Sequence, residues 1–281
     1  MFGRVYLGEI KKLIRPRGLI ILGVILLVAA IIYAAVFEGI VQEAEMASAI
    51  SAENFTVLFF NILTGIVVIY AIVVAAGLYA EEYKRGTIKM VMLRPVSRSA
   101  LTVAKLLAAF TYIGGIILSV TILVFLYGWA RYGSVATEEI TLFFNGETEY
   151  RTTLGAKTAM AIFFNILSVF FYMIVAFAIG TMSKKKTLGI VLTIVLEAGV
   201  FSLPFTMIDT LANVEVRRFL FSVNADLSGY FGTSTSIFSE LAALTSIPKG
   251  GNLYIALGAL AVYLSALLVP TFILVEKRDV V

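Results

Sequence analysis

The chain of 281 residues contains no cysteine and no histidine, and only 14% of its residues are charged. Without cysteine it has no disulfide and no thiol nucleophile, and without histidine it has no Ser-His triad, HExxH zinc site or imidazole ligand. The phosphate-binding pattern GxxxxGK[ST] is also missing. We therefore expect that this chain alone does not hydrolyse a nucleotide and that it has no cofactor of its own.

The sequence is instead rich in apolar residues, at 60% hydrophobic with a mean hydropathy of +0.98, whereas the apolar share of a soluble domain is nearer to half. A membrane-spanning helix requires ~20 predominantly apolar residues, and continuously apolar runs of this length do not fit the alternating strands of a β-barrel. We predict an all-α membrane protein with one transmembrane domain over residues 1–281 and no nucleotide-binding domain. The six predicted spans are at about 18–37, 56–78, 101–127, 156–182, 188–205 and 253–275.

The basic residues indicate the orientation of the spans. If the amino terminus is cytoplasmic, the inner segments carry 16 Lys and Arg residues and the outer segments carry 6. Such an excess on the cytoplasmic side is the usual pattern of membrane proteins, so we expect both termini in the cytoplasm. The basic pI of 9.2 then reflects this orientation, and we infer no nucleic-acid partner from it.

Two segments outside the spans have recognisable patterns. Residues 2–15, FGRVYLGEIKKLIR, form an amphipathic helix that would lie along the lipid headgroups, or alternatively a basic flank that stops membrane transfer. Residues 139–153, EITLFFNGETEYRTT, place Asn145–Gly146 between extended residues, which is a strong β-hairpin signal. We expect a small external hairpin between the third and fourth spans.

The segment between the second and third spans, AEEYKRGTIKMVMLRPVSRS at 80–99, concentrates charge that the rest of the chain lacks. Gly86 interrupts helical order, and about one and a half turns follow before Arg94, which Pro95 biases out of the helical region. Ser97 or Ser99 can cap the next helix. The segment therefore reads as a helix, a break and a second helix at the cytoplasmic surface.

Two interpretations of this segment are open. A basic loop that only fixes the orientation is common in membrane proteins. However, Ile88, Val91 and Met92 share one helical face, and such a face with a charged rim suits a helix that enters a groove on a partner.

The segment resembles the loop after the second span of type-2 ATP-binding-cassette (ABC) permeases, whose pattern is E-x-x-x-G-T, a short apolar run, R-P-V-S-R and then K. The match is close over about 25 residues, and six spans with inward termini extend it loosely over the chain. The residues that carry the resemblance are Glu82, Gly86–Thr87, Leu93, Pro95–Val96–Ser97–Arg98 and Lys105.

The resemblance implies the membrane subunit of an exporter in the cell membrane of a prokaryote. The amino-terminal helix would be a connecting helix, and the segment after the second span would be a coupling helix seated on a separate ATPase. Two permease subunits, identical or paralogous, would pair with two ATPases that bind ATP and Mg. The residues that this resemblance assigns to ATPase coupling are Glu81, Glu82, Lys84, Arg85, Gly86, Thr87, Ile88, Lys89, Val91, Met92, Arg94, Pro95 and Arg98.

Three polar residues within the predicted spans are further candidates. Asn61 and Asn165 need hydrogen-bond partners in the lipid layer and should face the bundle interior. Glu197 lies ~15 Å into the fifth span, which leaves three interpretations open: a protonated group bonded to a neighbouring helix, a polar group on the transport surface, or a proton relay. The alternatives to an ATP-driven permease are a proton-coupled transporter that uses Glu197 and a membrane scaffold without transport.

Overall fold

The structure, a computed structural model, describes residues 2–14, 16–43, 51–88, 96–144, 148–198, 220–225, 227 and 253–277. Its helices are α1 (Phe2–Leu13), α2 (Pro16–Glu43), α3 (Ala52–Lys84), α5 (Arg98–Tyr132), α6 (Leu154–Ser183), α7 (Lys186–Glu197), α9 (Phe221–Ala225) and α11 (Leu253–Lys277). Its strands are β1 (Glu139–Phe144) and β2 (Thr148–Thr153).

Five helices of the described part are long and apolar enough to cross a membrane, so the chain is a multi-pass, predominantly helical membrane protein. They contain the candidate spans Ile20–Gly39, Gly65–Lys84, Arg98–Tyr132, Leu154–Ser183 and Ala256–Lys277. Among the described residues, the predicted span 188–205 corresponds to α7, which ends at Glu197. Residues 199–205 of that prediction lie outside the described part.

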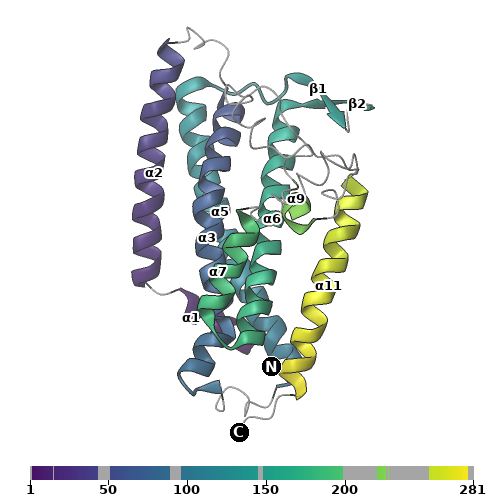
Figure 1. The fold of residues 1–281 in the computed structure, drawn as a ribbon. Helices are drawn as coiled ribbons and strands as arrows, with labels where there is room; N and C mark the ends of the chain where they lie inside the picture. The colour runs from purple at the N-terminus through teal and green to yellow at the C-terminus, as the bar shows by residue number, and fades with distance from the viewer. Residues whose placement is uncertain are drawn as a thin grey trace.

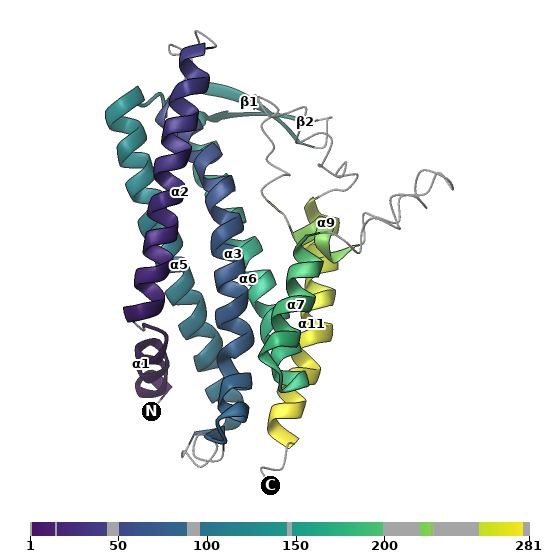
Figure 2. The same cartoon turned by 60° about the vertical axis from the view of Figure 1, so that its left-hand side comes forward.

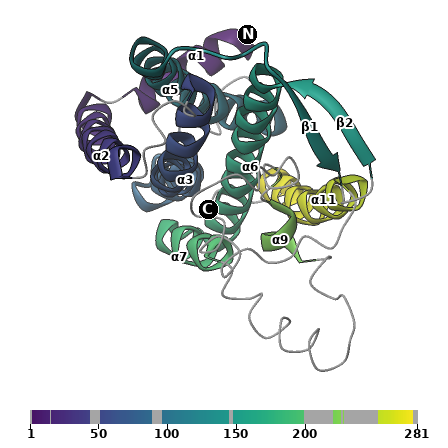
Figure 3. The same ribbon diagram turned by 90° about the horizontal axis from the view of Figure 1, so that it is seen from above.

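The long helices run side by side, with α1 at one end of the bundle and the β1–β2 hairpin at the other (Figures 1 and 2). The carboxy-terminal end of α11 lies at the same end of the bundle as α1 (Figures 1 and 2). Seen end-on, α3 and α6 lie towards the middle, and α2 and α11 lie on opposite sides (Figure 3). Accordingly, the core cluster contains buried side chains from α3, α5 and α6, whereas the span windows of α2 and α11 are mostly uncovered.

The starts of α3, α5 and α6 follow from local capping. The hydroxyl groups of Ser51, Ser97 and Thr153 each accept a hydrogen bond from a backbone N–H three residues later, at the first turns of α3, α5 and α6. Such caps satisfy backbone donors that have no partner inside the helix. Therefore α5 begins at Arg98, directly after one of the two serines that the sequence proposed as caps.

Three helices meet at a contact made of small residues. A Cβ added at Gly180 of α6 would lie 2.6 Å from the carbonyl oxygen of Ala76 in α3. A Cβ added at Gly189 of α7 would lie 2.9 Å from both the Ala176 carbonyl oxygen and the Ala76 Cβ. Small residues are typical where membrane helices approach closely. This contact, formed by Ala76, Gly180 and Gly189, holds α3, α6 and α7 together.

The β1–β2 hairpin and the hydrogen-bonded carboxylate of Glu53 lie at the end of the bundle opposite α1. Strands β1 and β2 pair antiparallel from Glu139–Thr153 to Phe144–Thr148. The predicted turn residues Asn145 and Gly146 lie outside the described part. Near the strands, Glu53 of α3 accepts hydrogen bonds from the Ser134 hydroxyl and from the backbone N–H of Val135. These two hydrogen bonds fix the start of α3 against the segment that connects α5 to the hairpin.

Candidate functional site

The charged segment 80–99 begins within α3, which ends at Lys84, and ends within the first turn of α5, which begins at Arg98. Helix α3 continues to Lys84, and Gly86 then adopts a φ of +70°, in the left-handed region that favours glycine. The Gly86 N–H donates to the carbonyl of Tyr83 at 3.2 Å, which closes the helix end. Gly86 therefore breaks the helix, as the sequence predicted. The candidates Lys89, Val91, Met92, Arg94 and Pro95 lie outside the described residues.

A buried cluster of charged groups lies between α1, α3 and α5, next to segment 80–99. The Nζ atom of Lys105 in α5 lies 2.7 Å from Glu82 Oε1 of α3 and 2.9 Å from Glu9 Oε2 of α1. The Lys105 side chain is 1% exposed and the Glu9 side chain 5% exposed. A charge buried without a partner would be strongly unfavourable, and removal of one member of a buried pair leaves the other uncompensated. The Glu9–Lys105–Glu82 triad therefore fixes three helices at one point.

Further contacts surround the triad. Lys12 lies 2.7 Å from Glu9 and 3.5 Å from Glu82, so the two carboxylates share two ammonium groups. The Tyr79 hydroxyl is hydrogen-bonded to Thr102 at 2.9 Å, and Lys105 Nζ lies 5.2 Å from the centre of the Tyr79 ring. The Lys105 ammonium therefore has the two carboxylates as hydrogen-bond acceptors and the Tyr79 ring as an aromatic face, which lowers the cost of its burial.

The pKa of Glu9 reflects this setting. Burial alone would raise the pKa of this carboxyl group. The positive charge of Lys105 and the hydrogen bonds donated by Lys12 and Lys105 outweigh burial, so the pKa lies below its ordinary value of 4.5. Glu9 is therefore ionised at neutral pH.

A second ion pair connects α3 to the start of α7. Glu81 lies 2.7 Å from Lys186 and 3.2 Å from Arg85, with both contacts partly exposed. In addition, Lys184 Nζ lies 5.6 Å from the centre of the Tyr83 ring. The lysine-rich loop between α6 and α7 therefore lies against the last turn of α3.

Arg98 connects the start of α5 to the end of α11. Its Nη1 atom donates to the carbonyl oxygen of Glu276 at 2.8 Å and to that of Val275 at 3.5 Å. Carbonyls in the last turn of a helix have no intrahelical partner, and a basic side chain is favourable there. Together with the triad and the Glu81–Lys186 pair, Arg98 links α1, α3, α5, α7 and α11 around segment 80–99.

The other predicted residues are distributed as follows. Ile88 is buried in the chain's own core cluster, so a contact with a partner would require it to leave that core. Lys84 and Arg85 are exposed, and Thr87 donates to the carbonyl oxygen of Glu82 at 3.5 Å. Lys84 and Arg85 are therefore the coupling candidates among these whose side chains are accessible to a partner.

The intramembrane candidates lie apart from this cluster. Glu197 is partly buried at the last residue of α7. Asn165 of α6 is 7% exposed, which agrees with the predicted inward position. Asn61 belongs to α3, but its side chain lies outside the described part of the chain.

Sequence reasoning missed Glu9 and the internal role of Glu81 and Glu82. In α1, the buried residues are Val5 and Glu9, which are four positions apart and so share a helical face. Glu9 is also the sole acid in the amphipathic segment 2–15. An acid next to the apolar face of a basic helix was the available signal, and it indicates a basic partner elsewhere in the chain.

Comparisons with known proteins place the chain in a family. A family model described as "Protein of unknown function (DUF2705)" matches residues 19–281. The chain is 26% identical over 231 residues to the uncharacterized protein YhcI of Bacillus subtilis (strain 168). This alignment covers 79% of the chain and 66% of YhcI, so the chain spans slightly less than two thirds of that relative. No solved structure matches. Because the family model covers most of the sequence, the chain belongs to the DUF2705 family.

Proposed function

We propose that this chain is the membrane subunit of an ATP-driven exporter of the ABC type and that segment 80–99 receives force from a separate ATPase. The proposal rests on the resemblance of Glu82, Gly86–Thr87, the 94–98 run and Lys105 to the loop pattern of type-2 ABC permeases. The absence of a phosphate-binding motif from the sequence is consistent with an ATPase on another chain.

The structural observation that supports the proposal most is the buried Glu9–Lys105–Glu82 triad. It joins the helices on both sides of segment 80–99 to α1. A displacement of this segment would therefore be transmitted to α1, α3 and α5 together, because separating them would expose unpaired buried charges. A loop that served only to fix orientation would not need such a rigid support.

The triad also changes the role expected for Glu82. The resemblance assigns it to the ATPase contact, but its Oε1 atom is bonded to Lys105 at 2.7 Å within the chain. Its Oε2 atom is buried and has no hydrogen-bond partner among the described residues. We therefore propose that Glu82 positions the segment and that the exposed Lys84 and the apolar residues Val91 and Met92 contact the ATPase.

Co-purification tests this proposal. The tagged chain, isolated from its native membranes, should bring down an ATPase that has a phosphate-binding loop. The double change Val91→Ala/Met92→Ala, or the charge reversal Lys84→Glu, should reduce both recovery of the ATPase and the coupling of its hydrolysis to transport. The matched control is Val262→Ala on α11, where the side chain is 68% exposed.

Two outcomes would reject the proposal. One is unchanged ATPase recovery and coupling in the Val91→Ala/Met92→Ala and Lys84→Glu variants. The other is transport by proteoliposomes that contain only this chain, driven by a proton gradient and lost in Glu197→Gln. That result would establish the proton-coupled alternative.

A further inference from the structure

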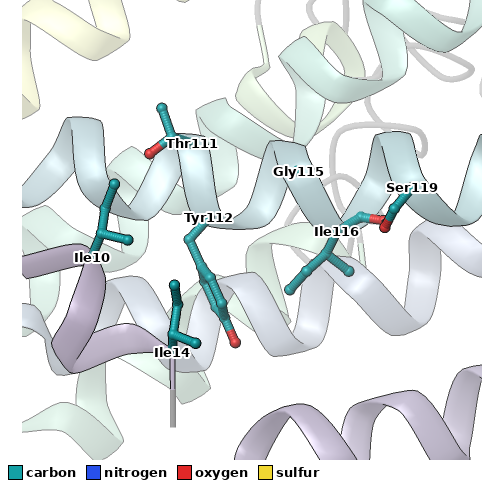
Figure 4. A pocket seen from close by; sticks show the side chains of 7 residues that line it. All are labelled: Ile10, Ile14, Thr111, Tyr112, Gly115, Ile116 and Ser119. Carbon is teal, nitrogen blue, oxygen red and sulfur yellow. The ribbon is translucent and has the colours of Figure 1, made fainter. Parts of the chain in front are cut away.

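A groove lies where α1 meets the membrane-spanning helix α5. Ile10 and Ile14 of α1 form one wall, and residues of α5 between Thr111 and Ser119 form the other (Figure 4). The Tyr112 ring lies between these walls, and the groove has a volume of about 340 Å³. This volume is at the lower end of the range for small-molecule sites.

The groove presents an apolar surface because its hydroxyl groups are already hydrogen-bonded within the chain. Thr111 accepts from Tyr6 at 3.0 Å and donates within α5, and Ser119 donates to the carbonyl of Ile116 at 2.8 Å. The Tyr112 hydroxyl is bonded to that of Tyr70 at 2.8 Å. A polar ligand would find few free partners here, whereas a hydrocarbon chain needs none.

The direction of the groove matches that of a lipid tail. From Thr111 to Ser119 the α5 wall extends ~12 Å along the helix axis, at 1.5 Å per residue. Because α5 crosses the membrane, this direction is close to that of the acyl chains. The neighbouring residues Leu118, Ile122 and Leu123 are 50%, 57% and 66% exposed, so the groove continues into an exposed apolar surface on α5.

The charges beside the groove are positive. Lys11 of α1 is exposed, and it lies between Ile10 and Ile14 in the sequence of the same helix. The acid of α1, Glu9, is occupied by Lys105 and Lys12. Basic residues near a membrane surface attract anionic lipids with about 1 kcal/mol each. The end of the groove at α1 therefore favours a negatively charged headgroup.

We propose that this α1–α5 groove binds one anionic phospholipid, with an acyl chain along α5 from Thr111 to Ser119 and the phosphate group beside Lys11. The bound lipid would fill the space between α1 and α5. The proposal depends on the membrane location of the chain and not on any ATPase, so it stands or fails separately from the proposed transport function.

Filling the groove tests the proposal. A Cβ added at Gly115 meets no atom within 4 Å, so Gly115→Leu can occupy the groove without a clash in the protein. The matched control is Gly258→Leu in α11, where a Cβ also meets nothing within 4 Å. The full chain, purified in detergent, is titrated with phosphatidylglycerol or phosphatidylcholine, and bound lipid is counted by native mass spectrometry.

The wild-type chain should retain one phosphatidylglycerol in preference to phosphatidylcholine. Gly115→Leu should weaken retention about tenfold, the factor expected for the loss of contacts to about two methylene groups. Gly258→Leu should leave retention unchanged. Lys11→Gln should reduce the preference for phosphatidylglycerol about fivefold while phosphatidylcholine binding stays constant.

Equal retention by wild type, Gly115→Leu and Gly258→Leu would overturn the proposal, as would equal retention of the two lipids by the wild type. If Gly115→Leu does not fold, Ser119→Leu fills the same groove and carries the same expectation. A second copy of the chain is the rival occupant. Since the sequence has no cysteine, Ser119→Cys introduces a single thiol. A disulfide-linked dimer of this variant in membranes would place a protein in the groove and reject the lipid.

Discussion

Lys105 and Glu82 lie on different helices, 23 residues apart in sequence, and their charged atoms are 2.7 Å apart in a region where the lysine side chain is 1% exposed. Glu9 completes this arrangement from α1 at 2.9 Å. The charged groups that the sequence concentrates near segment 80–99 are thus partly internal, and they hold the helices that enter and leave it.

Replacement of Lys105 by methionine should destabilise the chain strongly. Lys105→Met keeps an unbranched side chain one atom shorter but leaves the carboxylates of Glu9 and Glu82 facing each other without the buried ammonium. Loss of one partner from a buried ion pair costs about 3–5 kcal/mol. Unfolding in detergent, followed by circular dichroism, measures the change in free energy.

The control is Lys185→Met, at an exposed position, which should change the free energy of unfolding by less than about 0.5 kcal/mol. Adding Glu9→Gln and Glu82→Gln to Lys105→Met should recover much of the lost stability, because no buried charge is then unpaired. Similar losses in the Lys105 and Lys185 variants would show that the triad does not stabilise the fold.

The stability of the chain should fall in acid partly through Glu9. Its pKa is lower in the folded chain than the ordinary value of 4.5, so its ionised form stabilises the fold above that pH. This contribution is lost as the pH falls below 4.5 and through the folded-state pKa. The melting temperature of wild type and Glu9→Gln, measured from pH 7 to pH 3, should show a smaller decrease below pH 4.5 in the variant. Parallel curves would contradict the assignment.

The contact between α3, α6 and α7 should not tolerate a methyl group. In Gly180→Ala, the new Cβ would lie 2.6 Å from the Ala76 carbonyl oxygen, so the helices must separate. Such overpacking costs about 1–3 kcal/mol. Gly258→Ala is the matched control, since nothing lies within 4 Å of its added Cβ and alanine is the better helix former. Comparison of the two melting temperatures checks this, and a Gly180→Ala protein as stable as the control would argue against the close approach.

Removal of the Arg98 side chain should loosen the end of α11. Arg98→Ala leaves the carbonyls of Val275 and Glu276 without the bonds donated by the guanidinium, at a local cost of about 1 kcal/mol. Hydrogen exchange of the amides at 271–277 should become several-fold faster. Arg131→Ala, which removes the exposed pair with Glu38, should leave those amides unchanged. Unaltered exchange in Arg98→Ala would show that α11 is held at this end by other contacts.

Five of the six predicted spans lie in helices long and apolar enough to cross a membrane, because continuous apolar runs of about 20 residues reflect the demands of the lipid layer directly. The amphipathic segment 2–15 and the hairpin pattern at 139–153 also correspond to α1 and to β1–β2. The helices extend beyond the apolar runs, however. For example, α3 runs to Lys84 because its last turn is stabilised by ion pairs, which hydropathy does not detect.

The pairing of charges could not be read from the sequence. Glu9 and Lys105 are 96 residues apart, and no local pattern states that α1 packs against α5. Lys105 did carry a signal, because it lies among the buried, uncharged residues Leu101, Thr102 and Ala109 of the same helix. A basic residue at such a position requires an acidic partner, but one sequence does not identify which acid meets it.

The small-residue contact of Ala76, Gly180 and Gly189 determines how the bundle can move. Backbones that touch so closely cannot slide past one another, so α3, α6 and α7 form a single stiff block. In contrast, α2 and α11 contribute no residue to this contact, and most of the span window of each helix is uncovered. A displacement of the end of α3 would therefore move α6 and α7 with it, because the three helices cannot separate or slide without loss of this contact.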